Sequence, residues 1–145
     1  MFPQREPFRV LCGTVRSPAP GDWRAKEMAR ILIVDDDVDS ALTLARMLQE
    51  SGHDETRVEH SARTALATAV EFHPNIIFVD VELPDMSGYD VALLLHQHPQ
   101  LRRMRLIALT DSGEHLGREH ARQAGFERYL VKPIGVAALQ EVLET

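Results

Sequence analysis

The chain has 145 residues, a formal net charge of −6 and 44% hydrophobic residues, the size and composition of one globular domain. Its one cysteine excludes an internal disulfide, and its apolar runs are far shorter than the ~20 residues that span a membrane. The acidic balance argues against a surface that coats nucleic acid. We therefore expect a cytoplasmic domain with no direct nucleic-acid or membrane partner.

The first 27 residues differ from the rest in charge and composition. Residues 1–27 have a net charge of +2 and residues 28–145 one of −8, and the first segment contains four prolines without a sustained apolar period. Proline interrupts both helix and sheet, so we expect a flexible arm before a domain at 28–145. Met28 directly precedes the first strand-like run. Two interpretations stay open: the arm is a non-native leader, or it is a linker remnant or docking segment.

Strand-like and helix-like patterns alternate from Arg30 onward. Short β-branched or apolar runs and one more polar edge run predict strands at Ile31–Val34, Glu55–Glu59, Ile76–Val79, Leu106–Leu109 and Arg128–Val131. Apolar residues at helical spacing predict helices over Val38–Leu48, Ala62–Val70, Val91–Leu95, Gly113–Ala124 and Gly135–Glu144. The residues expected to face inward on these helices include Val38, Leu42, Val70, Leu94 and Val136.

Five strands alternating with five helices predict an α/β fold, a doubly wound parallel sheet with helices on both faces. In such a sheet the ligand site lies at the carboxyl ends of the strands. Asp35 and Asp36 follow the first strand, Asp80 the third, Thr110 ends the fourth, and Lys132 follows the fifth. We expect these five residues to meet at one edge of the sheet.

The residue types at this edge suggest phosphoryl transfer. Carboxylates gathered there repel, at about 4 kcal/mol for two charges ~4 Å apart and an effective dielectric constant near 20. Mg²⁺ prefers oxygen ligands and keeps waters that can bridge to a phosphate. Lys132 offers a point charge and Thr110 a hydroxyl for phosphoryl oxygens. The sequence thus predicts a carboxylate nucleophile, a metal and two phosphate-binding groups.

Four separated motifs resemble those of one family. They are Asp35-Asp36, the segment from Asp80 to Gly88, Leu109-Thr110, and the segment from Tyr129 to Pro133. Together they resemble the receiver domain of bacterial two-component response regulators over residues 29–145, with stretches that look most like receivers attached to hybrid sensor kinases. The resemblance implies a flavodoxin-like (βα)5 fold with strand order 2-1-3-4-5.

The resemblance also implies a role for each acidic residue. Asp80 would accept a phosphoryl group from a phosphohistidine of a sensor histidine kinase or a histidine phosphotransfer protein. Mg²⁺, for which Mn²⁺ can substitute, would be bound by the side chains of Asp36 and Asp80, by Asp35 directly or through a water, and by the backbone carbonyl of Glu82. Such a domain is a phosphoacceptor and not an enzyme acting on other substrates.

The remaining motif residues would bind the phosphoryl group and report its presence. By the resemblance, Thr110 and Lys132 hold the phosphoryl oxygens, and Tyr129 turns inward when Thr110 moves towards the phosphate. The Lys132-Pro133 bond is typically cis in the family. The surface formed by residues 113–144 would then contact a downstream protein partner.

Two residues bear on signalling strength. Asp111 stands where the family usually has a small residue, and its carboxylate could slow entry of the phosphodonor or alter the switch. Glu82 stands where family members vary and tune the lifetime of the phosphate. The histidines, among them His96, His98, His115 and His120, have spacings that favour solvated surface positions over a metal site.

Three other functions fit parts of the pattern less well. A flavodoxin-like cofactor binder needs a loop after the first strand that donates hydrogen bonds to phosphate, and Asp35-Asp36-Asp37 would repel it. A Mg²⁺-dependent phosphohydrolase could use Asp35 and Asp37, but Asp39 stands where a small or β-branched residue is expected, and no insertion could form a cap. A degenerate receiver that only binds a partner would not need the complete site.

Overall fold

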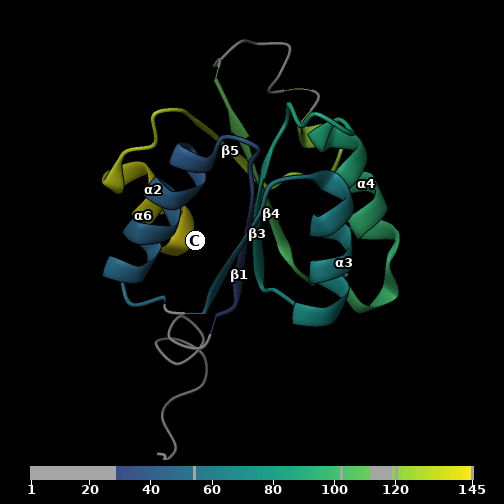
Figure 1. Cartoon of the computed structure of the whole chain (residues 1–145), viewed down its shortest axis with the longest axis horizontal. Coiled ribbons are helices and arrows are strands. Elements are labelled where there is room, and N and C mark those ends of the chain that lie inside the picture. The colour runs from purple at the N-terminus through teal and green to yellow at the C-terminus, as the bar shows by residue number, and fades with distance from the viewer. Residues whose placement is uncertain (1–28, 54, 102, 112–118, 120, 145) are drawn as a thin grey trace, which may run out of the picture.

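A computed structural model describes residues 29–53, 55–101, 103–111, 119 and 121–144 of the chain. Five parallel strands form one sheet in the order β2-β1-β3-β4-β5, which confirms the expected order (Figure 1). The strands are β1 (Ile31–Val34), β2 (Thr56–Glu59), β3 (Ile76–Asp80), β4 (Arg105–Thr110) and β5 (Arg128–Val131). The proposed arm at 1–27 and most of the helix expected at 113–124 lie outside the described residues.

Helices cover both faces of the sheet. They are α2 (Val38–Glu50), α3 (Ala62–Phe72), α4 (Gly88–Gln97) and α6 (Val136–Glu144), with a short 3-10 helix, η1 (Pro99–Leu101). Figure 1 shows α2 and α6 on one face and α3 and α4 on the other. Within the described residues, no helix is long and apolar enough to cross a membrane.

The central strands are apolar at every position because both of their faces are covered. In β1, Ile31 and Ile33 pack in the core beneath α2 and α6, whereas Leu32 and Val34 pack in the core beneath α3 and α4. All four are fully buried. This alternation explains why the strand has a continuous apolar run instead of the alternating pattern of a half-exposed sheet.

Short-range signals fix where the helices begin and end. Asp37 is the N-cap of α2 and accepts hydrogen bonds from the backbone of Asp39 and Ser40. Ser61 caps α3 in the same way through the Thr64 N–H. Gly52, at φ 95°, follows α2 in the left-handed conformation that glycine tolerates best. Each of these residues lies next to the helix end that it caps, so the signals are local in sequence.

Five residues expected to face inward are exposed instead. The buried stripes are narrower than the sequence pattern suggested: Ala41, Leu44, Ala45 and Leu48 in α2, for example. The neighbouring apolar residues lie outside these buried stripes, and Val38 and Val136 are the first residues of their helices. The exposed residues are Val38, Leu42, Val70, Leu94 and Val136.

A glycine is required where α4 begins. A Cβ at Gly88 would lie 2.4 Å from the backbone oxygen of Asp80 and 2.6 Å from the Cα of Val81, and neither atom can rotate away. We expect Gly88→Ala to lower the free energy of unfolding by about 2 kcal/mol or more, measured by denaturant titration followed by circular dichroism. The matched control is Gly135→Ala, whose Cβ would meet no atom within 4 Å. Equal unfolding midpoints for the two variants would contradict this prediction.

Candidate functional site

The register of the sheet places two carboxylates side by side. Val34 in β1 pairs with Val79 in β3, so the next residues, Asp35 and Asp80, lie together at the carboxyl edge. Both are buried, at 1% and 7% exposure, and Asp36 beside them is exposed. One oxygen from each of the three carboxylates lies within 4.8 Å of the others. The expected gathering of these carboxylates is confirmed.

Lys132 is the cation that faces this pair. Its Nζ lies 2.7 Å from Asp35 Oδ2 and 2.8 Å from Asp80 Oδ2, although Lys132 is far away in sequence. It directly follows β5, and its backbone N–H donates to the carbonyl of Thr110 at the end of β4 (2.8 Å). The neighbouring strand ends therefore fix where the lysine enters the site, and the Lys132-Pro133 peptide bond that follows is cis.

The second oxygen of each buried carboxylate accepts a backbone hydrogen bond. The N–H of Asp37 donates to Asp35 Oδ1 at 3.0 Å, and the N–H of Glu82 donates to Asp80 Oδ1 at 2.8 Å. Each carboxylate is thus held between a backbone donor and Lys132. These contacts fix the orientation of both side chains before any ligand arrives.

Burial and pairing act in opposite directions on these charges. Burial raises the pKa of the Asp35 carboxyl above its ordinary value, despite the hydrogen bonds from Lys132 and Asp37. Burial lowers the pKa of Lys132, but the hydrogen bonds and charges of Asp35 and Asp80 outweigh it, so that the pKa lies above its ordinary value. The ammonium therefore stays charged at neutral pH, and three carboxylates face one cation. The donor set of hard oxygens with excess negative charge fits a divalent cation such as Mg²⁺.

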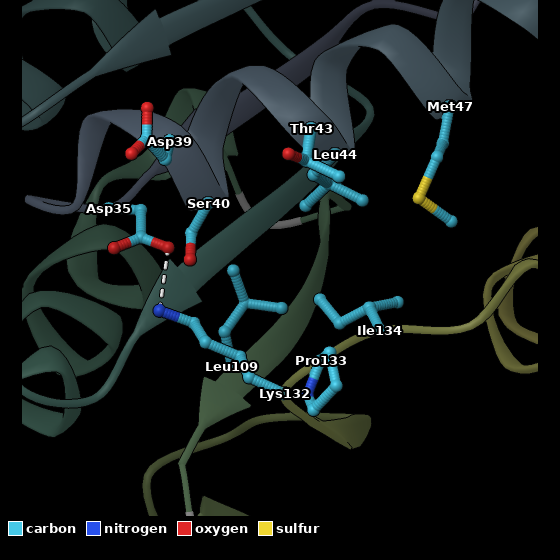
Figure 2. A pocket seen from close by; sticks show the side chains of 10 residues that line it. All are labelled: Asp35, Asp39, Ser40, Thr43, Leu44, Met47, Leu109, Lys132, Pro133 and Ile134. Atoms are coloured by element: carbon cyan, nitrogen blue, oxygen red, sulfur yellow. Dashed lines mark ion pairs between the residues drawn. The ribbon is translucent and has the colours of Figure 1, made fainter.

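A cavity of about 220 Å³ adjoins the site between α2 and the connection from β5 to α6. Figure 2 shows Asp35 and Lys132 at one end of it, joined by their ion pair, and Met47 farther along α2. Leu109 and Pro133 also line its wall. The acidic edge of the sheet thus opens beside a mostly apolar hollow.

The other expected site residues lie at or near the same edge. Thr110 ends β4 and is half-buried, whereas Asp111 and Glu82 are exposed. Tyr129 in β5 is half-buried and packs against the core on the side of α3 and α4. Thr110 and Tyr129 therefore lie on the adjacent strands β4 and β5, with Thr110 at the carboxyl end of its strand.

Sequence reasoning missed two side chains that join the site to α3. The carboxylate of Asp85 accepts hydrogen bonds from the backbone N–H groups of Ala62 (2.9 Å) and Arg63 (3.1 Å). The Nδ1 of His60 donates to the backbone carbonyl of Asp35 at 2.8 Å. Neither contact leaves a local pattern in the sequence, because each joins residues more than 20 positions apart.

The histidines only partly match the expected surface positions. His96 and His98 are both half-buried, and His96 Nε2 lies 3.1 Å from the carbonyl of Gly125. His53 is buried at 6% exposure, which corrects the expectation, because its N–H donates to the carbonyl of Leu48 and the turn after α2 keeps it next to the end of that helix. His115 and His120 lie outside the described residues.

Comparison with known proteins identifies the family. The family model described as the response regulator receiver domain matches residues 31–144. The chain belongs to this family. The polar-differentiation response regulator DivK of Brucella ovis is 32% identical over 115 residues, which cover 79% of this chain and 93% of DivK. The resemblance inferred from the four motifs is therefore confirmed.

Solved receiver structures share the fold. The chemotaxis response regulator CheY4 of Vibrio cholerae matches with a TM-score of 0.75 and 26% identity, covering 81% of this chain and 97% of CheY4. A CheY-like receiver domain from Methylobacillus flagellatus matches with a TM-score of 0.72 and 28% identity, covering 80% of this chain and 96% of that one. This receiver domain therefore has the CheY-like, flavodoxin-like architecture and functions in two-component signalling.

Proposed function

We propose that this receiver domain accepts a phosphoryl group on Asp80 from a phosphohistidine of a sensor histidine kinase or a histidine phosphotransfer protein. The observation that supports this proposal is the pairing of Asp80 with Lys132 beside Asp35 and Asp36 at the carboxyl edge of the sheet. Asp80 ends a strand, its carboxylate is oriented by two contacts, and a cation lies where negative charge must be balanced.

In the proposed step, an Asp80 carboxylate oxygen attacks the phosphorus of the phosphohistidine. The O–P bond forms as the P–N bond breaks, and the imidazole leaves with the electron pair of that bond and is protonated. Lys132 and the hydroxyl of Thr110 would bind oxygens of the transferred group. Mg²⁺, held by Asp35, Asp36, Asp80 and the backbone carbonyl of Glu82, would supply charge neutralisation, and Mn²⁺ could substitute.

We further propose that Thr110 and Tyr129 couple phosphorylation to the 113–144 surface. A phosphoryl group can bias a two-state equilibrium only through contacts that differ between the states. The hydroxyl of Thr110 would gain such a contact by closing on a phosphoryl oxygen, which leaves space for Tyr129 to turn inward. A downstream protein partner would recognise the altered surface, and no direct contact with nucleic acid is involved.

The proposed function also implies a cellular compartment and domain boundaries for this chain. We place the protein in the cytoplasm, where the phosphohistidine of a sensor kinase is available. Residues 28–145 would form the receiver domain, and residues 1–27 an arm that this chemistry does not require. The domain would act as a phosphoacceptor and not on other substrates.

Acetyl phosphate with Mg²⁺ tests the proposed function directly. We expect intact-mass analysis to show one added phosphoryl group that base removes and that peptide mapping places on Asp80. EDTA should prevent the labelling, and amide hydrogen exchange in β5 and α6 should change on labelling in the parent but little in Thr110→Ala. A parent protein that takes up no phosphoryl group from acetyl phosphate or from a phosphorylated kinase would leave a protein-binding module as the function.

A further inference from the structure

The loop after Asp80 is closed at its base by the backbone. The N–H of Gly88 donates to the carbonyl of Val81 at 3.0 Å, and Glu82 forms an antiparallel bridge with Ser87. The N–H of Glu82 also donates to Asp80 Oδ1. The loop from Val81 to Ser87 is therefore closed at its base, and the backbone of Glu82 is held to the carboxylate of Asp80.

The tip of this loop is attached to a different element. Asp85 lies there, exposed, and its two carboxylate oxygens each accept one backbone hydrogen bond, from Ala62 at 2.9 Å and from Arg63 at 3.1 Å. These N–H groups belong to the first turn of α3, where no helical carbonyl is available to them. The N–H of Thr64, which follows Arg63, donates to the side-chain hydroxyl oxygen of Ser61. The first turn of α3 is thus capped by its own N-cap residue and by a carboxylate from the loop.

The same end of α3 is also attached to the first strand. His60, which directly precedes the N-cap residue of α3, donates from Nδ1 to the backbone carbonyl of Asp35 at 2.8 Å. The start of α3 therefore joins both segments that supply carboxylates to the site: β1 through His60 and the loop after β3 through Asp85. Hydrogen bonds from Ala62 and Arg63 hold the pKa of Asp85 below its usual range, so the carboxylate is ionised at neutral pH.

We propose that Asp85 is a positioning residue for the metal site, because its carboxylate ties the loop that carries the Glu82 carbonyl to the N-terminus of α3. This inference rests on the proposed function, in which Glu82 and the three aspartates hold a divalent cation. Asp85 does not touch the metal. It fixes the distance between the loop and β1, and so it sets how well the carbonyl and the carboxylates can bind one ion together.

Mn²⁺ titration, followed by the electron paramagnetic resonance signal of the free ion, tests this role without any phosphorylation. We expect Asp85→Ala to weaken Mn²⁺ binding about tenfold, as is typical when a group that orients a metal ligand is removed. Asp85→Asn keeps one acceptor oxygen and should lose less affinity. Amide hydrogen exchange should quicken at Ala62 and Arg63 in Asp85→Ala, which reports the lost tie directly.

Two further variants separate the possible outcomes. Asp90→Ala removes an exposed carboxylate from the first turn of α4 and controls for the change in net charge, so it should bind Mn²⁺ like the parent. Asp36→Ala removes a metal ligand and should lose binding. Parent-like affinity in both Asp85 variants, with loss in Asp36→Ala, would overturn the positioning role alone. Unchanged affinity in Asp36→Ala would overturn the proposed metal site and this inference with it.

Discussion

Asp80→Asn is expected to abolish phosphorylation by acetyl phosphate and by a phosphorylated kinase while the protein stays folded. The amide is a far weaker nucleophile than the carboxylate, so labelling should fall to the background of the assay. The fold should survive because asparagine has nearly the same shape, and its carbonyl can still accept the N–H of Glu82 or face Lys132. Intact-mass analysis gives the labelling, and thermal unfolding reports the fold.

Asp90→Asn is the matched control for this variant. It makes the same change in net charge at an exposed position in the first turn of α4 and should label like the parent. Labelling of Asp80→Asn at the parent rate would show that another residue accepts the phosphoryl group. Loss of labelling in both variants would indicate an effect of net charge instead of a lost nucleophile.

Most of the fold was predictable because its signals are local. The apolar run of β1 is a property of residues close in sequence, and the structure has this strand where expected. The caps Asp37 and Ser61 are local in the same way. The helix faces were less predictable. Val38 and Val136 continue an apolar stripe, but each is the first residue of its helix and is exposed, which depends on the packing around the helix end and not on the local sequence.

The strand ends of the site were predictable, and the supports around them were not. Alternating strands and helices predict a parallel sheet, so Asp35, Asp80 and Lys132 had to approach one another at one edge. The hydrogen bonds of Asp85 and His60 depend instead on how a loop and a helix start meet in three dimensions. A carboxylate that caps a distant helix looks, in sequence, like any exposed acidic residue.

The role of Lys132 in stability can be tested apart from its role in phosphoryl transfer. In Lys132→Met, the buried carboxylates of Asp35 and Asp80 would face each other without a cation. Breaking a buried pair by removing one partner typically costs 3–5 kcal/mol, and we expect about 3 kcal/mol here because the lysine side chain is slightly exposed. Denaturant unfolding in EDTA at pH 7 measures this loss. Arg46→Met removes an exposed positive charge from α2 and should change stability little.

The loss in Lys132→Met should depend on pH in a defined direction. The pKa of Asp35 is already raised by burial, and without the lysine it should rise further. When the pKa of an acid is higher in the folded than in the unfolded protein, the acid lowers the unfolding free energy at a pH above its pKa in the unfolded state. This loss disappears at low pH, where the group is protonated in both states. The difference in unfolding free energy between parent and variant should therefore shrink as the pH falls from 7 towards 4.

Mg²⁺ should increase the stability of Lys132→Met more than it increases that of the parent protein. A ligand that binds only the folded state stabilises it by RT ln(1 + [L]/Kd), so tighter binding gives a larger increase in stability. Removing Lys132 removes a positive charge that competes with a metal for the same carboxylate oxygens, Asp35 Oδ2 and Asp80 Oδ2. Mg²⁺ should therefore raise the unfolding free energy of Lys132→Met more than that of the parent and recover part of the loss seen in EDTA. An equal or smaller increase in the variant would mean that the cation does not bind between these carboxylates.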